Sequence, residues 1–205
     1  MKLKICGITS KKDAEDAVGL GVDALGFICY SQSPRYIAEE KIHEIIYSIP
    51  PFVTSVGVFV NESADVVNEV VKNCKLDLVQ LHGDETPEEC MKINTRVIKA
   101  IHVNSMDDIQ YIGKYNGTVS GVLLDTKVEG SYGGTGQSFD WGVALAAKDY
   151  GIPIILSGGI SINNINQAVQ LVNPEAIDLC SSVEKSPGLK DYEKMKDIIK
   201  VFRSL

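Results

Sequence analysis

The first 29 residues contain a complete strand–helix–strand pattern. Residues 3–29 read LKICGITSKKDAEDAVGLGVDALGFIC. The runs Leu3–Cys6 and Ala24–Cys29 are short and mainly apolar, as in buried strands, and the polar stretch Lys11–Gly19 between them has helical periodicity. A thiol, Cys6, ends the first of these runs and is followed directly by Gly7. The stretch predicts one complete βα unit followed by the strand of the next βα unit.

The same alternation continues to the end of the chain without a linker or a low-complexity segment. Six further strands are predicted: Ser55–Phe59, Leu78–Leu81, Val97–Ile101, Val119–Leu124, Pro153–Leu156 and Ala176–Leu179. Seven further helices are predicted: Ala38–Tyr47, Ala64–Asn73, Pro87–Ile93, Met106–Ile112, Val143–Asp149, Ile162–Val172 and Tyr192–Phe202.

Eight βα units of roughly 25 residues match a compact α/β fold, the (β/α)8 TIM barrel, over residues 1–205 as one domain. The main alternative is a doubly wound open sheet, which often carries a G-x-G-x-x-G turn after its first strand. No such turn follows Cys6. The sequence therefore favours the barrel.

Composition and charge narrow the class of partner. The chain is 44% hydrophobic with a formal charge of −7, and it has no apolar run long enough to cross a bilayer. The acidic balance argues against a nucleic-acid surface or an anionic membrane surface, but it permits a local basic pocket. The five cysteines are odd in number and form no C-x-x-C pair, so a reducing compartment fits best. Without a secretory signal at its N-terminus, the chain is expected in the cytoplasm, acting on a small molecule.

Polar side chains stand where the predicted strands end, which is where active-site residues of TIM barrels lie. The positions that carry chemistry are Cys6, Arg35, His82, His102, Asp125 and Asp178. For Cys6 alone, a buried structural cysteine is the commoner explanation. The convergence of a thiol, carboxylates, an arginine and two histidines at one rim favours an active site.

Three late segments are rich in glycine or serine. Gly133–Gly136 follows the sixth predicted strand, Gly158–Gly159 the seventh and Ser181–Ser182 the eighth. Such backbone can turn its N–H groups toward an anion, and TIM barrels often bind phosphate with the loops after their last two strands. These segments could instead be flexible turns, but their placement favours a phosphorylated substrate.

Taken together, these motifs resemble the phosphoribosylanthranilate isomerase family over essentially the whole chain. The residues that carry the resemblance are Lys4–Thr9, Gly26–Phe27, Ser33–Arg35, Gly57–Asn61, Gln80–Gly83, Leu124–Thr126, Gly133–Gly136, Phe139–Trp141, Ser157–Ile160 and Ser182–Glu184. No single motif would suffice, and their order on consecutive strands is what distinguishes this family from other phosphate-binding barrels.

The resemblance implies a cofactor-free Amadori rearrangement in L-tryptophan biosynthesis. N-(5-phosphoribosyl)anthranilate would become 1-(2-carboxyphenylamino)-1-deoxyribulose 5-phosphate, with no metal. By matching positions, Asp125 would be the general acid that protonates the ring oxygen, and Cys6 would be the general base that takes the C2′ proton.

Each role makes a physical demand. A general acid needs an apolar or negatively charged environment, and Asp125 follows the apolar run Val122–Leu124. A thiol serves as a base near neutral pH only if its pKa is lowered, for example by a nearby cation. Lys4 lies two residues before Cys6 and so points to the same side of the strand. We therefore predict an inward-facing Lys4 that lowers the pKa of Cys6.

The resemblance also implies binding residues. Arg35, stiffened by Pro34, would pair with the anthranilate carboxylate, unless it is a surface loop cation. Asp178 would bond the sugar hydroxyls or the Schiff-base nitrogen, or else be structural. His82 would form a hydrogen bond near the substrate, and a metal shared with His102 is not expected. The phosphate would be held by Gly134, Gly158, Gly159, Ser181 and Ser182.

The chain departs from the family pattern at two places. Gln137 stands where lysine is common, and Cys180–Ser182 stands where Ser-Ser-Gly is usual. The second change matters more, because residue 182 would place a side chain beside the phosphate.

Two other functions stay open on the sequence alone. An aminoaldose isomerase of histidine biosynthesis would be expected to carry a carboxylate at the position of Cys6. A non-catalytic barrel that binds a phosphorylated metabolite would need the late loops but neither Cys6 nor Asp125. Both a monomer and a homodimer are compatible with the sequence.

Overall fold

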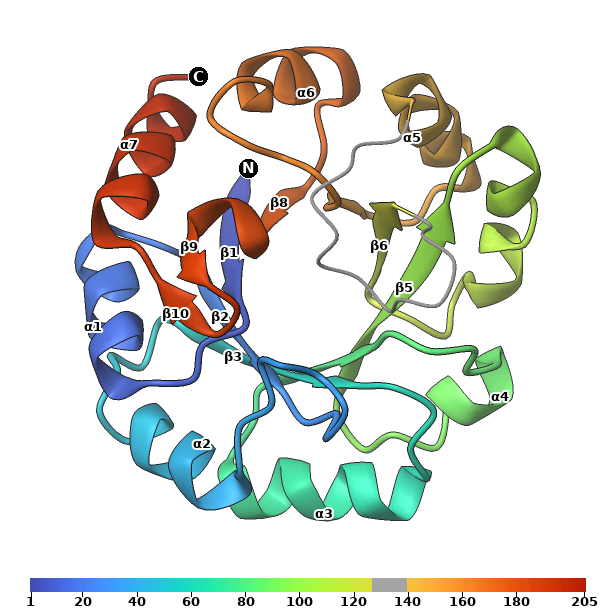
Figure 1. Ribbon diagram of the computed structural model, residues 1–205. Helices are drawn as coiled ribbons and strands as arrows, with labels where there is room; N and C mark the ends of the chain where they lie inside the picture. The colour runs from blue at the N-terminus through green and yellow to red at the C-terminus, as the bar shows by residue number, and fades with distance from the viewer. Residues whose placement is uncertain (127–139) are drawn as a thin grey trace.

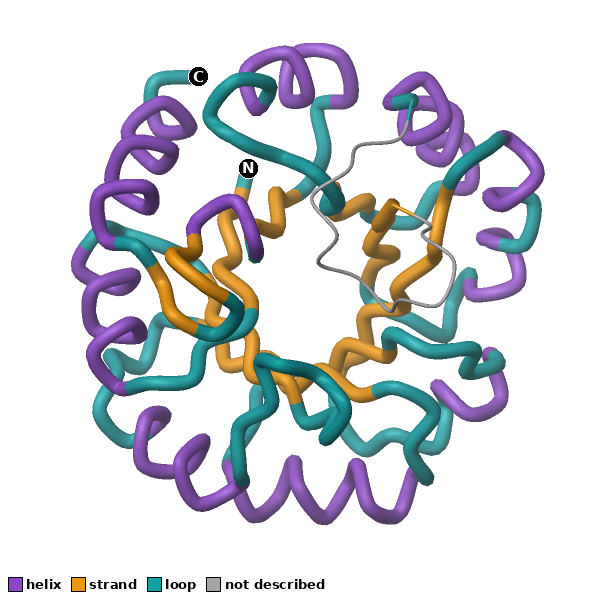
Figure 2. Tube along the Cα trace, in the orientation of Figure 1, coloured by secondary structure: helices purple, strands orange, loops and turns teal. Residues whose placement is uncertain are grey.

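Eight parallel strands close into a barrel in chain order, and the last strand pairs with the first (Figure 1). The structure is a computed structural model that describes residues 1–126 and 140–205. Helices surround the strands on the outside of the ring, as Figure 2 shows by colour. The predicted TIM barrel is confirmed.

The barrel strands are β1 (Lys2–Cys6), β2 (Ala24–Ile28), β3 (Thr54–Phe59), β4 (Leu78–Leu81), β5 (Arg96–Val103), β6 (Gly121–Thr126), β7 (Ile154–Leu156) and β8 (Ala176–Leu179). The α-helices are α1 (Lys11–Gly19), α2 (Glu39–Ile46), α3 (Ala64–Cys74), α4 (Pro87–Cys90), α5 (Trp141–Ala147), α6 (Ile165–Val172) and α7 (Tyr192–Arg203). Short 3-10 helices are η1 (Met106–Ile109), η2 (Ile112–Tyr115), η3 (Lys148–Tyr150) and η4 (Ser181–Val183). After η4, β9 (Glu184–Ser186) and β10 (Leu189–Lys190) form a small antiparallel ribbon.

The apolar residues form two separate clusters, because side chains alternate between the two faces of each strand. The larger cluster lies between the strands and the helices and includes Leu3, Ile5, Leu25 and Phe27, each fully buried. The smaller cluster fills the barrel interior with Val56, Leu78, Ile98, Ala100 and Leu123. Further along the same inward-facing rows stand Cys6 on β1 and Asp125 on β6. The interior is thus apolar below and polar toward the carboxyl ends of the strands.

Three predicted helices are shorter or different in the structure. The prediction Pro87–Ile93 is wrong beyond Cys90, where α4 ends, because the N–H groups of Lys92 and Ile93 bond the carbonyls three residues back, as in a tight turn. The prediction Ile162–Val172 is wrong before Ile165, because the Asn164 side chain bonds the Ser161 backbone in a turn.

The prediction of one helix over Met106–Ile112 is also wrong, because two short 3-10 helices, η1 and η2, take its place. The carboxylate of Asp108 accepts from the backbone of Asn104 and Ser105, which fixes a tight turn. Asp and Ser side chains that bond nearby backbone in this way compete with a regular helix.

In the described ranges, no helix is long and apolar enough to cross a membrane.

A buried charge network joins β5 to the loop after β4. Nζ of Lys99 lies 3.2 Å from Oε2 of Glu85, and it donates to the carbonyls of Gly83 at 2.7 Å and Ala100 at 2.8 Å. Glu85 in turn accepts from the backbone of Asn61 at 2.8 Å. The network satisfies both charges, which are nearly inaccessible to solvent.

We predict that Lys99→Met destabilises the protein by about 3 to 5 kcal/mol, because removing one partner leaves the buried Glu85 charge uncompensated. Urea unfolding followed by circular dichroism measures the change. Lys12→Met is the control, since Lys12 pairs with Asp16 on an exposed surface and its loss should leave the unfolding midpoint nearly unchanged. Equal midpoints for both variants would contradict the prediction.

Candidate active site

A buried ion pair crosses between the first and last strands of the barrel. Lys4 and Asp178 are register partners on β1 and β8, and Nζ of Lys4 lies 3.0 Å from each carboxylate oxygen of Asp178. Both side chains are almost inaccessible. The predicted inward orientation of Lys4 is confirmed. Burial alone would lower the pKa of Lys4, but Asp178 and Cys6 together keep it above its ordinary value.

The carboxyl group of Asp178 has a higher pKa than an ordinary aspartate. Burial, together with the nearby charges of Cys6 and Asp125, raises its pKa to about 7, although Lys4 acts in the opposite direction. The Asp178 carboxyl is thus less acidic than an ordinary aspartate, and its pairing with Lys4 favours the charged form.

Cys6 ends β1 with its thiol inside the barrel and is 5% exposed. A Cβ atom on Gly26 of β2 would lie only 2.7 Å from Sγ of Cys6, so glycine at that position makes room for the sulfur. A hydrogen bond from the Cys180 thiol, followed by the Lys4 and Lys190 charges, holds the pKa of Cys6 well below its ordinary value, although burial acts in the opposite direction. The site thus favours a thiolate.

Asp125 stands near the end of β6, where one neighbour donates a hydrogen bond to its carboxylate and a second lies close by without one. Its Oδ1 accepts a hydrogen bond from the Thr126 backbone at 2.8 Å, and Oδ2 lies 3.3 Å from Nε2 of His82. Nδ1 of His82 is 2.8 Å from Nε2 of Gln80. With the Gln80 amide donating to Nδ1, a neutral imidazole carries its hydrogen on Nε2, which faces Asp125.

The second histidine lies beside the first but outside this chain of contacts. Nε2 of His102 is 3.2 Å from the carbonyl oxygen of His82, and the two rings are 5.1 Å apart. Burial and the neighbouring His82 lower the pKa of His102. In the part of the chain that the structure describes, no three His, Cys, Asp or Glu side chains come together as a metal site would need.

Arg35 is fixed by the ribbon that follows β8. Its Nε and Nη2 bind both oxygens of Glu184, at 3.0 and 2.8 Å for the two closest contacts. Lys190 binds the same carboxylate at 2.8 Å, so two cations share one anion. The cluster has a net positive charge, and the Nη1 group of Arg35 lies outside the ion pair.

The structure describes two of the three late segments that the sequence singled out. Gly158 and Gly159 have φ of +75° and +65°, a region that disfavours other residues. Ser181 and Ser182 begin η4, and the buried Ser182 hydroxyl has no hydrogen-bond partner among residues 1–126 and 140–205. Gly134 and the rest of Gly133–Gly136, as well as Gln137, lie outside the described residues.

The structure brings Cys6, Asp178 and Arg35 together on one side of the barrel mouth, and it joins His82, Asp125 and Gly158 on another. Sequence reasoning assigned no role to Glu184, Lys190 or Cys180. For Cys180 the sequence held a signal, because Cys180 directly follows the predicted last strand as Cys6 ends the first. The structure pairs the residues just before them, Ile5 and Leu179. Lys190 lies in a two-residue strand that no periodicity marks.

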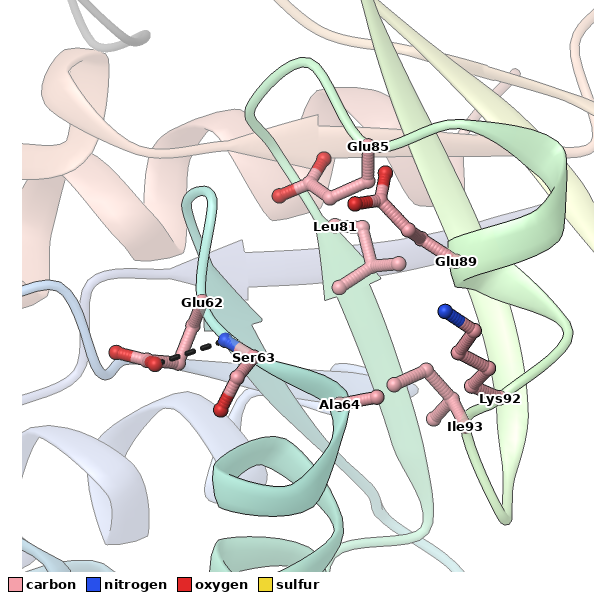
Figure 3. Close-up of a pocket in the computed structure, with 8 residues that line it drawn as sticks. All are labelled: Glu62, Ser63, Ala64, Leu81, Glu85, Glu89, Lys92 and Ile93. Atoms are coloured by element: carbon pink, nitrogen blue, oxygen red, sulfur yellow. Dashed lines mark hydrogen bonds between the residues drawn. The ribbon is translucent and has the colours of Figure 1, made fainter.

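A pocket of about 220 Å³ lies away from these residues (Figure 3). It is lined by Leu81 of β4, by the start of α3 and by residues around the short α4. Glu85 and Glu89 face it, but Glu85 is already bonded to the backbone of Asn61. The pocket contains none of the predicted site residues.

A TIM barrel with a thiolate and two carboxylates at the carboxyl ends of its strands defines an enzyme of the acid–base class. Comparison with known proteins gives the family. The model of the family "N-(5'phosphoribosyl)anthranilate (PRA) isomerase" matches residues 3–201. The N-(5'-phosphoribosyl)anthranilate isomerase of Trichlorobacter lovleyi is 49% identical over 200 residues, which cover 98% of this chain and 97% of the relative.

Solved structures agree. Phosphoribosyl anthranilate isomerase from Thermotoga maritima has a TM-score of 0.93 at 40% identity, with both chains fully covered. An isomerase in complex with reduced 1-(o-carboxyphenylamino)-1-deoxyribulose 5-phosphate has a TM-score of 0.90 at 39% identity, again over the whole of both chains. A further Thermotoga maritima structure is described as monomers generated from a dimeric enzyme.

The chain belongs to the phosphoribosylanthranilate isomerase family, whose members are enzymes of tryptophan biosynthesis. The family resemblance predicted from the sequence is confirmed. The alternative of a non-catalytic binding barrel is wrong, because the relatives are isomerases.

We predict that Gly158→Ala strongly lowers isomerase activity. A Cβ atom there would lie 2.5 Å from the Thr126 backbone nitrogen and 2.8 Å from Oδ1 of Asp125, so the end of β6 must shift. Gly151→Ala is the matched control, because Gly151 has a similar φ of +72° and open space around its Cα. Steady-state kinetics of both variants measure the effect. An equal loss of activity in both would point to backbone strain alone, and full activity in Gly158→Ala would contradict the prediction.

Proposed function

We propose that the chain converts N-(5-phosphoribosyl)anthranilate into 1-(2-carboxyphenylamino)-1-deoxyribulose 5-phosphate, with Asp125 as general acid and Cys6 as general base. The observation that carries the proposal is the pairing of an activated thiol on β1 with a supported carboxylic acid on β6. Both face the barrel interior at the carboxyl ends of their strands. A relative at 39% identity binds reduced 1-(o-carboxyphenylamino)-1-deoxyribulose 5-phosphate, the reduced form of the proposed product, which supports the choice of substrate.

In the first step Asp125 gives its proton to the furanose ring oxygen. The C1′–oxygen bond breaks and the anthranilate nitrogen supplies its electron pair, which leaves a protonated Schiff base. The backbone N–H of Thr126 donates to Oδ1 and orients the carboxyl group, and it stabilises the carboxylate that forms. Nε2 of His82 lies 3.3 Å from Oδ2 and has no hydrogen-bond partner among the described residues, so it is close enough to add a second donor during the reaction.

In the second step the Cys6 thiolate takes the proton from C2′. The electrons of that C–H bond move toward the Schiff-base nitrogen, which is the electron sink, and an enolamine results. Tautomerisation of the enolamine gives the ketone. The chain's own residues need no resident metal or redox cofactor for these steps, because the substrate nitrogen accepts the electrons.

Binding is assigned to the charged and glycine-rich surroundings. Nη1 of Arg35, outside the Glu184 pair, faces the anthranilate carboxylate in this proposal. The backbone N–H groups of Gly158, Gly159 and Ser181 hold the phosphate, together with those of Ser182 and Gly134. The unpartnered Ser182 hydroxyl adds a donor there. Asp178 accepts from a sugar hydroxyl while it keeps Lys4 in place.

The proposal also covers the domain, the location and the partners of the chain. A single barrel domain over residues 1–205 and a cytoplasmic location are supported by the closed strand order and by five free cysteines. The partner is a phosphorylated small molecule, as in the relative that binds such a compound. Both a monomer and a homodimer are compatible with a relative described in both forms.

We predict that Cys6→Ser and Asp125→Asn each lower kcat by about 10²- to 10⁴-fold, the usual contribution of a general acid or base. Loss of anthranilate fluorescence on mixing with fresh substrate measures turnover. Cys29→Ala is the control, since Cys29 packs against the outer apolar cluster and should keep wild-type activity. Full activity in Cys6→Ser would reassign the base without removing the isomerase function.

The pH profile tests the thiolate. Because the pKa of Cys6 is lowered from 9.0, the thiolate persists below that pH, and kcat/KM should fall only as the pH drops through the lowered value. Lys4→Met removes a cation that lowers this pKa, so we predict that the acid limb moves to higher pH by about one unit or more. An unmoved acid limb in a folded Lys4→Met protein would rule out Lys4 as the cause.

A further inference from the structure

Arg35 lies over the end of the first barrel strand. A Cβ atom on Gly7, the residue after Cys6, would lie 2.9 Å from Cδ of Arg35. The same atom would lie 3.5 Å from Nζ of Lys190, whose side chain is fully buried. Because residue 7 has no side chain, both cations can lie next to the strand end that carries the Cys6 thiol.

Glu184 occupies one edge of the Arg35 guanidinium. A guanidinium is planar, with a single hydrogen on Nε and a pair on each Nη atom. The Arg35 Nε lies 3.0 Å from Oε1 and 3.1 Å from Oε2 of Glu184, and Nη2 donates to Oε2 at 2.8 Å. Nη1 makes no hydrogen bond with residues 1–126 or 140–205. The edge formed by Nη1 and the remaining hydrogen of Nη2 is therefore left for a ligand.

Glu184 is itself held by the ribbon that carries it. Its Oε1 accepts a hydrogen bond from Nζ of Lys190 at 2.8 Å and from the Gly188 backbone at 3.2 Å, and its side chain is almost inaccessible. The Lys190 charge also offsets the Glu184 charge, so the cluster with Arg35 stays positive. A ligand carboxylate can thus approach Arg35 without meeting an uncompensated negative charge.

We propose that Glu184 is a positioning residue that makes the site select substrates with a carboxylate on the arylamine. By holding the Nε edge of Arg35, it presents the Nη1–Nη2 edge, which matches the two oxygens of a planar carboxylate. The inference rests on the proposed function in taking Arg35 as the partner of the anthranilate carboxylate. It adds a residue that need not touch the substrate and that acts on the binding of this one group.

The test uses two ligands that differ only in the carboxylate. One is reduced 1-(o-carboxyphenylamino)-1-deoxyribulose 5-phosphate, the compound bound by a relative, and the other carries a plain phenyl ring instead. Calorimetric titration gives the dissociation constant of each ligand. The constant for the phenyl ligand divided by that for the carboxyphenyl ligand is the carboxylate ratio, which measures what the carboxylate contributes to binding.

The carboxylate ratio is measured for wild type, Arg35→Met and Glu184→Asp. Glu184→Asp keeps the charge, but its carboxylate is one methylene farther from Arg35 and cannot reach Nε and Nη2 together. Glu193→Asp is the matched control, because it makes the same change in an exposed pair with Lys196. Circular dichroism checks that each protein is folded.

We expect a wild-type carboxylate ratio of about 10 to 150, as for a hydrogen bond between charged groups. Arg35→Met should bring the ratio close to unity. In Glu184→Asp the ratio should fall by about five- to tenfold, as for the loss of one hydrogen bond. KM for the isomerase substrate should rise with it while kcat stays nearly unchanged, because the contact persists from substrate to transition state. Glu193→Asp should keep the wild-type ratio.

The two proposals fail in different ways. A ratio that falls in Arg35→Met but not in Glu184→Asp would keep Arg35 as the carboxylate partner and refute the role of Glu184. Equal weakening of both ligands in Glu184→Asp would refute it as well, because a merely structural role has that effect. An unchanged ratio in Arg35→Met would refute the assigned carboxylate partner and the inference with it, while wild-type turnover still reports on the isomerisation.

If Glu184→Asp does not fold, the wild type decides. The Nε–H proton of Arg35 gives a nuclear magnetic resonance signal that is identified by its absence in Arg35→Met. It should exchange slowly with water in the free protein and keep its chemical shift when the carboxyphenyl ligand binds, because it faces Glu184. Fast exchange in the free protein, or a large shift on binding, would overturn the inference.

Discussion

The ion pair between Lys4 and Asp178 is the interaction on which the reaction centre depends. Two opposite charges are buried 3.0 Å apart inside the barrel, where removing either would leave the other uncompensated. The pair places an ammonium group beside Cys6 and a carboxylate close enough to both Cys6 and Asp125 for their charges, in addition to burial, to raise its pKa. One contact across the junction of β1 and β8 therefore influences the pKa of both its partners and of Cys6.

The barrel makes this arrangement possible because its interior is layered. Apolar residues such as Val56, Ile98 and Leu123 fill the lower part, and the charged residues stand above them at the carboxyl ends of the strands. Lys4, Asp125 and Asp178 are each about 5% exposed or less, so their charges interact more strongly than charges at the surface. The buried Lys99–Glu85 pair stiffens the segment after β4, which also carries His82.

Much of the fold follows from local sequence. The strands β4 and β8 begin and end where the sequence predicts, because each is a short apolar run between clear turn residues. The helix ends were less predictable, since local turns that periodicity does not mark replace the helix, as at Lys92 and Ile93 after α4. Lys4, Cys6 and Asp125 could be identified from position along a strand. The hold of Glu184 on Arg35 could not, because it joins residues 149 positions apart.

That hold has a consequence for affinity. Glu184 and Lys190 keep the Arg35 guanidinium in one orientation, and Arg35 is only 9% exposed. A free arginine side chain loses up to about 2 kcal/mol of rotamer freedom when it is immobilised. Here that entropy is lost when the chain folds, so an incoming carboxylate meets a donor group that is already still, and ligand binding does not bear the cost a second time.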